Sequence, residues 1–174
     1  MYKFIILLSI TILSNPLQAQ SNTKLLSDAL ALSIPMLSYG ATLYNEDKQG
    51  QEEFYYAYGT TVLLTSTLKY SIDKKRPDNN GNDSFPSGHT SSAFTGATFI
   101  HKKYGFKYAV LPYVGAIYTA YSRVHLKRHD NLDVLTGALI GIGSAWYFTS
   151  PYKKVQVQPV IQSNYTGLKV AYQW

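Results

Sequence analysis

Five apolar segments, separated from one another by polar breaks, constrain the fold of this chain more than any other feature of its sequence. Their lengths suit helices better than strands, which are usually shorter. We therefore predict an all-α protein, a helical bundle of about five helices. The expected helices cover residues 24–44, 52–71, 90–103, 107–123 and 130–149.

The two ends of the chain differ from this helical pattern. The N-terminus has the layout of a secretory signal peptide. It has a positive charge at Lys3, then an apolar run, and then a small-residue cleavage site that ends at Ala19. The apolar run is shorter than the roughly 20 residues that cross a bilayer. We expect a signal peptide over residues 1–19, with a retained N-terminal anchor as the alternative. The protein would then be exported, and be periplasmic or membrane-associated facing the periplasm.

Beyond Pro151 apolar and polar residues alternate, first from Val155 to Gln158 and again from Leu168 to Tyr172. Such alternation predicts strands, and the polar residues between the two runs predict a turn. We expect a helical domain over residues 20–150 and a short C-terminal β-hairpin over residues 151–174. Gly, Asn, Asp and Pro crowd residues 77–86, which predicts a polar loop between the second and third helices.

The composition limits the classes of partner. The formal net charge is +6 and would be +5 without Lys3, which suits anionic substrates or an anionic membrane surface. Many of the lysines are explained equally well as solvated surface residues without a partner class, and we expect Lys74 and Lys75 to be solvated in this way. No nucleic-acid-binding motif is present, so we expect no nucleic-acid partner. The chain has no cysteine, which excludes disulfides and thiolate metal sites.

Four long stretches lack Asp, Glu, Lys and Arg, but only residues 134–152 approach the length that spans a bilayer. The stretches are also rich in Tyr, Thr, Ser and Gly. This pattern favours a soluble or membrane-surface bundle over an integral one, and the tyrosines suit a membrane interface.

Two cations precede the polar loop. Lys69 and Arg76 are seven residues apart, which on a helix would place both on one face before Pro77 ends it. This face would lead toward an anion, although a solvated face is the alternative.

Pro86, Ser87, Gly88 and His89 stand immediately before an apolar helical segment. The N-terminus of a helix presents free N–H groups that bind anions, and Gly88 would let a ligand approach the backbone. An ordinary helix cap beside a surface histidine is the alternative interpretation.

His129 and Asp133 are four residues apart, so on a helix they would share a face. The carboxylate could accept from one imidazole nitrogen and leave the other unprotonated as a nucleophile. Only five residues separate Arg123 from His129, so we expect Ser122 and Arg123 to lie close to His129. An exposed surface pair is one alternative, and a zinc site of His125, His129 and Asp133 is another.

These three blocks together resemble the full signature of the type 2 phosphatidic acid phosphatase and vanadium haloperoxidase superfamily. The resemblance rests on Lys69-x6-Arg76-Pro77, Pro86-Ser87-Gly88-His89 and Ser122-Arg123-x5-His129-x3-Asp133. It implies that His129 attacks phosphorus and forms a phosphohistidine, with Asp133 holding its orientation and His89 protonating the leaving oxygen. It also implies that the phosphoryl oxygens are bound by Lys69, Arg76, Ser87, Gly88 and Arg123.

In the phosphatase branch the resemblance implies hydrolysis without a metal or other cofactor. The expected substrate is a lipid phosphate, such as a phosphatidate, a polyprenyl diphosphate or a lipid A phosphate, reached by contact with a membrane surface. The alternatives are small soluble phosphate esters, a vanadium-dependent haloperoxidase, a zinc-dependent hydrolase, and a binding protein that captures a phosphorylated lipid without turnover.

Overall fold

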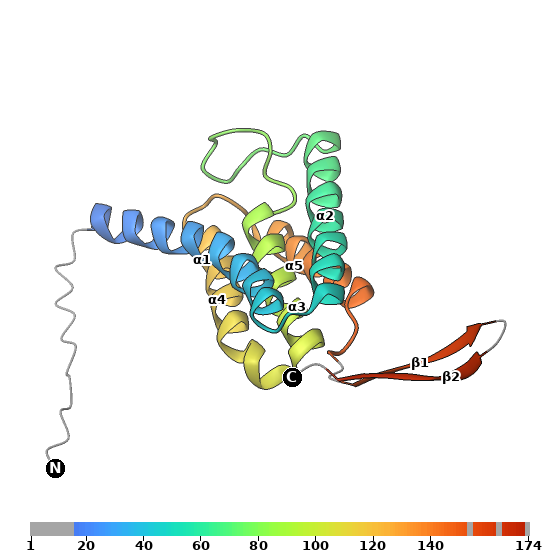
Figure 1. The fold of residues 1–174 in the computed structure, drawn as a ribbon. Coiled ribbons are helices and arrows are strands. Elements are labelled where there is room, and N and C mark those ends of the chain that lie inside the picture. Colours follow the sequence, from blue (N-terminus) through green and yellow to red (C-terminus); the bar gives the residue numbers. More distant parts are fainter. Residues whose placement is uncertain (1–15, 153–154, 163–164, 173–174) are drawn as a thin grey trace, which may run out of the picture.

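The structure is a computed structural model that describes residues 16–152, 155–162 and 165–172. Most of the predicted signal peptide therefore lies outside the described residues. Five helices form a bundle, which confirms the all-α prediction (Figure 1). They are α1 (Pro16–Tyr44), α2 (Lys48–Ser71), α3 (Gly88–Tyr104), α4 (Phe106–His125) and α5 (Asn131–Phe148).

The helix boundaries differ from the predicted ones mainly at the N-termini. α1 begins at Pro16, ahead of the predicted cleavage point after Ala19. α2 begins at Lys48 rather than at residue 52, because the Asp47 carboxylate accepts a hydrogen bond from the Gly50 N–H at 2.8 Å and caps the helix.

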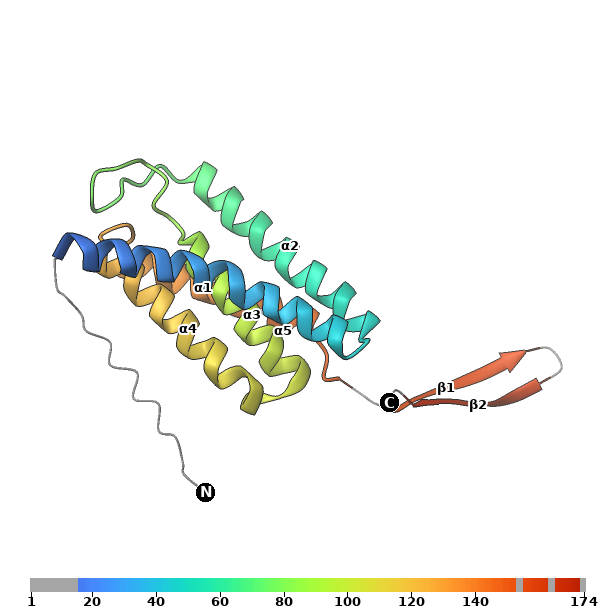
Figure 2. The ribbon, with the colours of Figure 1, turned by 60° about the vertical axis from the view of Figure 1, so that its left-hand side comes forward.

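The helix α3 lies at the centre of the bundle and packs against each of the other four helices (Figure 2). α1 and α2 meet at their short connection and diverge toward the opposite end of the bundle, as Figure 1 shows. That end also carries the loop before α3 and the start of α5, so elements far apart in the sequence come together there.

Small side chains let the helices approach closely. Buried Ala, Ser and Thr make up most of the core, and α5 turns Gly137 and Gly141 toward α3. A Cβ atom on either glycine would lie closer than 3 Å to a carbonyl oxygen of α3 or its cap, at Ser87 and Ser91. The two backbones are thus in contact, and this contact sets the N-terminus of α3 against that of α5.

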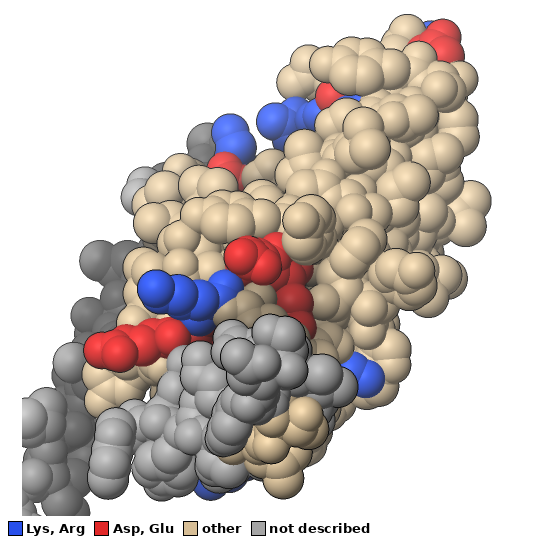
Figure 3. All heavy atoms as spheres, turned by 45° about the vertical axis from the view of Figure 1, so that its right-hand side comes forward, with Lys and Arg blue, Asp and Glu red and all other residues tan. Residues whose placement is uncertain are grey.

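The surface of the bundle carries many large apolar side chains. Leu63 on α2, Leu111 on α4 and Leu139 on α5 are each more than half exposed. Figure 3 shows a broad area without charged side chains between charged groups at its margins. Within the described residues no helix has both the length and the hydropathy needed to cross a bilayer.

The C-terminal segment forms the expected hairpin. β1 (Val155–Gln162) pairs antiparallel with β2 (Tyr165–Tyr172), in a register that sets Val155 opposite Tyr172. The hairpin extends away from the bundle in both ribbon views (Figures 1 and 2).

Candidate active site

The loop between α2 and α3 folds back on itself instead of continuing the helix. α2 ends at Ser71, and Lys74 then forms a bridge with Asp83 across the loop, closed by a hydrogen bond from the Ser84 N–H to the Lys74 carbonyl at 3.0 Å. The prediction that Lys69 and Arg76 share a helical face is therefore wrong. Lys69 lies in the last turn of α2, whereas Arg76 lies beyond the end of the helix, in the folded loop.

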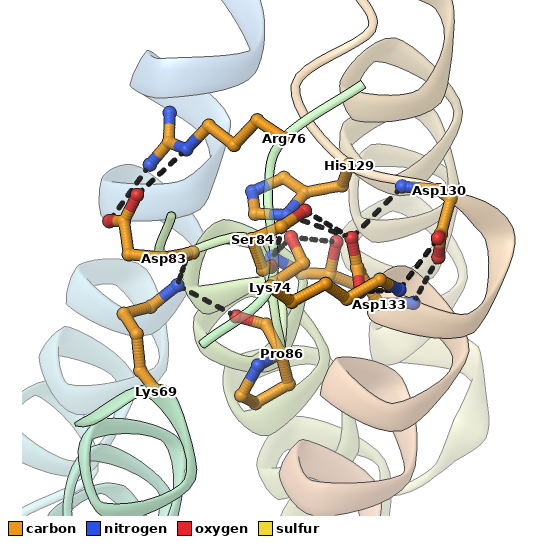
Figure 4. Close-up of polar contacts among 11 residues, drawn as sticks. Lys69, Lys74, Arg76, Asp83, Ser84, Pro86, His129, Asp130 and Asp133 are labelled. Carbon is orange, nitrogen blue, oxygen red and sulfur yellow. Dashed lines mark hydrogen bonds and ion pairs between the residues drawn. The ribbon is translucent and has the colours of Figure 1, made fainter. Parts of the chain in front are cut away.

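Asp83 brings the two motif cations side by side (Figure 4). Arg76 binds its carboxylate through two parallel hydrogen bonds of 2.9 and 3.0 Å. Lys69 donates to the Asp83 and Pro86 carbonyl oxygens at 2.5 and 3.0 Å. Burial lowers the pKa of Lys69, whereas the hydrogen bond from Arg76 holds the pKa of Asp83 below its usual range. The Lys69 ammonium and the Arg76 guanidinium therefore both lie next to Asp83.

The ring of His129 is held by a backbone carbonyl. Its Nδ1 lies 2.7 Å from the Ser84 oxygen and 3.6 Å from the nearer Asp133 oxygen. A carbonyl can only accept, so Nδ1 carries the proton, and Nε2 of the neutral ring is left with a lone pair. His129 and Asp133 lie close together as expected, but not on one helical face, because α5 starts at Asn131 and His129 precedes its cap; the hydrogen bond from Nδ1 goes to Ser84 instead of Asp133.

The carboxylate of Asp133 organises the surrounding backbone. One oxygen accepts from the Ser84 hydroxyl at 2.5 Å and from the Asp130 N–H at 3.0 Å, which completes a capping box. The other oxygen accepts from Lys74 at 2.7 Å, and Lys74 also lies 2.6 Å from Asp130. Lys74, expected to be solvated, instead ties the loop to the start of α5.

Burial lowers the pKa of His129 to about 4, and the charges of Lys69 and Arg76 act in the same direction. The hydrogen bond to Ser84 and the charge of Asp133 oppose this shift without cancelling it. His129 is therefore neutral at ordinary pH, which is the form that can act as a nucleophile.

The second histidine stands at the start of α3, as the sequence predicts. Ser87 is the N-cap residue, and its N–H donates to the Asp133 carbonyl at 3.0 Å. The next turn begins with Gly88 and His89, so the free N–H groups of this helix end point toward the loop and α5.

Asp28 of α1 links His89 to Arg123 of α4. One carboxylate oxygen lies 3.0 Å from His89 Nε2 and also accepts a hydrogen bond from the Arg123 guanidinium. Arg123 donates to the Ser27 hydroxyl as well, at 2.7 Å. Burial and the charge of Arg123 lower the pKa of His89, while Asp28 opposes both. Burial opposes ionisation of Asp28, yet the bond to Arg123 keeps its pKa low.

The sequence did not predict four residues that hold the motif side chains in place, namely Asp28, Lys74, Asp83 and Ser84. Asp28 lies far upstream of the motifs, and its one signal is that it is an isolated acid in an apolar segment. The other three lie in the connection between α2 and α3, where nothing local distinguishes them from solvated residues.

His125 is not part of this group. It is the last residue of α4, and its ring stacks on Tyr121 with centroids 5.6 Å apart. In the ranges that the structure describes, no three acidic or histidine side chains gather in a way that could hold a metal ion. This disfavours the arrangement of His125, His129 and Asp133 as ligands of one zinc ion.

A neutral histidine with a free nitrogen, a second histidine, three cations and a helix N-terminus meet at one end of an all-helical bundle. Such a fold and site define a class of proteins that handle a tetrahedral oxyanion such as phosphate. Residues 53–156 match the model of the PAP2 superfamily, and the chain belongs to this family.

Two characterised relatives share this region. A lipid A 4'-phosphatase of Helicobacter pylori is 39% identical over 107 residues, which cover 58% of this chain and 54% of that protein. A lipid A 1-phosphatase of Porphyromonas gingivalis is 44% identical over 92 residues, which cover 50% of this chain and 21% of that protein. The chain thus spans about half or less of the length of these relatives.

Among solved structures, LpxE of Aquifex aeolicus superimposes with a TM-score of 0.65 and 23% sequence identity. The superposition covers 78% of this chain and 87% of that one. It supports the same arrangement of helices.

Proposed function

We propose that this protein hydrolyses a phosphate monoester of a lipid through a phosphohistidine formed on His129. The observation that carries the proposal is the hydrogen bond from His129 Nδ1 to the Ser84 carbonyl. This bond leaves Nε2 unprotonated in a ring on which the charges of Lys69 and Arg76 act.

The first step breaks the ester bond. The lone pair of His129 Nε2 forms a bond to phosphorus, and the bond between phosphorus and the ester oxygen breaks as His89 donates a proton to that oxygen. In the second step His89 takes a proton from water, whose oxygen attacks phosphorus, and the bond to Nε2 breaks to release inorganic phosphate. Neutral His129 and protonated His89 are the required starting states.

Charge develops on the phosphoryl oxygens in both steps. Lys69, Arg76 and Arg123 supply fixed positive charge, while the N-terminus of α3 supplies the Gly88 N–H and the Ser87 hydroxyl as donors. Asp83 and Asp28 hold two of these cations, Arg76 and Arg123, in place. An arriving phosphate dianion would share or replace those carboxylate contacts.

A lipid substrate is supported by the two lipid A phosphatases among the relatives and by the surface of the bundle. The exposed leucines of α1, α2, α4 and α5 can contact a lipid surface. Contact with a membrane would bring the phosphate headgroup to the charged end of the bundle. Export by the predicted signal peptide, residues 1–19, would place this site on the periplasmic side.

The test is phosphate release by the full chain from a panel of lipid and soluble phosphate esters, measured in EDTA. We expect turnover of a lipid monoester by the unaltered protein, loss of at least about a thousandfold in His129→Ala, and near-normal turnover in the matched control His125→Ala. Turnover in His129→Ala equal to that of the unaltered protein would contradict the mechanism. Preference for the soluble esters would contradict the lipid substrate.

A further inference from the structure

A pocket of about 560 Å³ opens at the end of the bundle where α1 meets α2, opposite the candidate active site (Figure 1). Its walls come from the end of α1, the end of α3, the start of α4 and the segment after α5. Four of its eight described wall residues are tyrosines, namely Tyr44, Tyr104, Tyr108 and Tyr152. We call it the tyrosine pocket, and no step of the proposed reaction uses it.

Two of the tyrosines form a fixed inner corner. The Tyr104 hydroxyl donates to a carboxylate oxygen of Asp47 at 3.2 Å, and the Tyr152 hydroxyl donates to the Asn45 carbonyl at 3.3 Å. The two ring centroids lie 5.7 Å apart with the planes at 54°. The backbone N–H of Tyr152 also donates to the Lys103 carbonyl at 2.8 Å. These bonds hold both rings in place, so their faces form a preformed aromatic surface.

The other two tyrosines stand at the mouth of the pocket, where Tyr44 is 89% and Tyr108 is 57% exposed. The Nζ atom of Lys107 lies over the Tyr108 ring, 4.6 Å from its centroid. The face of an aromatic ring carries partial negative charge and attracts cations. One ring of the tyrosine pocket thus already holds an ammonium group of the protein itself.

Buried charges behind the corner act in the same direction. Lys103 is the one charged residue among the described wall residues, and its ammonium lies 3.0 Å from Glu53 and 3.4 Å from Asp47. Two carboxylates surround one ammonium, which gives this group a formal charge of −1. Burial raises the pKa of Tyr104 and of Tyr152, and the charge of Asp47 raises both further. The negative field therefore reaches the pocket wall, where it favours a cation over an anion.

We propose that the tyrosine pocket binds an organic ammonium group, carried by a small solute or by the headgroup of a lipid. The four rings surround the cation, and the buried carboxylates of Asp47 and Glu53 add to the attraction. A quaternary ammonium group suits such a site best, because it has no N–H that must be hydrogen-bonded. The proposal involves no phosphate and stands independently of the proposed function.

Choline and its uncharged isostere 3,3-dimethylbutan-1-ol test the role of charge. The two molecules have the same shape, but a carbon atom replaces the charged nitrogen in the isostere. Calorimetric titration of the full chain should show that choline binds at least about tenfold more tightly than the isostere. Equal affinities, or no binding of choline, would overturn the proposal.

Tyr44→Ala tests the location of the site. Tyr44 is 89% exposed, so its side chain can be removed without repacking the core, and the affinity for choline should fall about fivefold. Tyr147→Ala is the matched control, because Tyr147 is 82% exposed on α5 and is not among the described residues that line the pocket. Thermal unfolding establishes that both variants are folded. Equal affinities of the two variants for choline would overturn the assignment to this pocket. Neither titration contains a phosphate ester, so failure of the proposed function would leave both results unchanged.

Vesicles distinguish the two sources of the ammonium group. A lipid headgroup predicts that Tyr44→Ala weakens binding to dioleoylphosphatidylcholine vesicles about fivefold and leaves binding to dioleoylphosphatidylglycerol vesicles unchanged. Equal effects on the two kinds of vesicle would exclude the lipid headgroup and assign the pocket to a soluble ammonium compound.

Discussion

His129 Nδ1 lies 2.7 Å from the backbone carbonyl of Ser84, nearly 1 Å closer than it lies to the carboxylate of Asp133. The orientation of His129, the proposed nucleophile, therefore depends on the position of a loop backbone. Asp133 acts one step away, because it binds the Ser84 hydroxyl and the Lys74 ammonium and so fixes that loop. Groups that hold the loop should affect the reaction although they do not touch phosphate.

Lys74→Met tests this dependence. The substitution leaves the fully buried Asp133 carboxylate without its cation, which should lower the free energy of unfolding by about 2 kcal/mol and lower kcat by about tenfold. Lys75→Met is the matched control, because Lys75 is exposed and should change neither quantity appreciably. Urea unfolding and steady-state kinetics give both values, and identical behaviour of the two variants would contradict the role of Lys74.

Activity should be confined to acidic pH. The pKa of His129 is lowered to about 4, so protonation destroys the nucleophile as the pH falls through that value. The pKa of His89 is lowered from 6.5, so this proposed general acid loses its proton as the pH rises through a value below 6.5. The profile of kcat/KM should therefore be a bell with its alkaline limb below pH 6.5.

Asp28→Asn provides the control for this profile. Asp28 raises the pKa of His89, so its neutralisation should move the alkaline limb to lower pH. The ionisation of the substrate phosphate is unaffected by the substitution. An alkaline limb that does not move in Asp28→Asn would assign that limb to the substrate and not to His89.

Gly137→Ala tests the contact between α5 and α3. The added Cβ would lie 2.5 Å from the Ser87 carbonyl oxygen and must push the cap of α3 away. We expect a loss of about 2 kcal/mol in the free energy of unfolding and reduced kcat/KM. Gly143→Ala on the same helix meets nothing within 4 Å and should be neutral or stabilising by about 0.5 kcal/mol. Equal Tm values for the two variants would contradict this account.

Arg76→Lys retains the positive charge but loses the planar fork that binds Asp83 through two hydrogen bonds. We expect kcat/KM to fall by about a hundredfold, with little change in Tm because the partner carboxylate of Asp83 is exposed and such ion pairs add little stability. Unchanged kinetics would mean that charge alone is sufficient at this position.

The helices, the hairpin and the identity of the motif residues could be predicted from the sequence. Helix periodicity and strand alternation are local properties, and they located each helix that the structure describes. The N-cap at Ser87 also has a local cause, because Ser, Gly and a preceding proline favour a helix start. The predictions from residue spacing are wrong at Arg76 and His129. Both rest on helical geometry, whereas the two residues lie in loops.

The identity of the chemical groups was thus determined by the sequence alone: two histidines, three cations and a helix N-terminus in three spaced blocks. Only the tertiary structure decided their partners. The packing of α1 against α3 and α4 brings Asp28 to His89 and Arg123, and the folded loop brings Ser84 to His129. Those contacts join residues 45 to 95 positions apart, and no local pattern encodes them because they depend on how the helices pack.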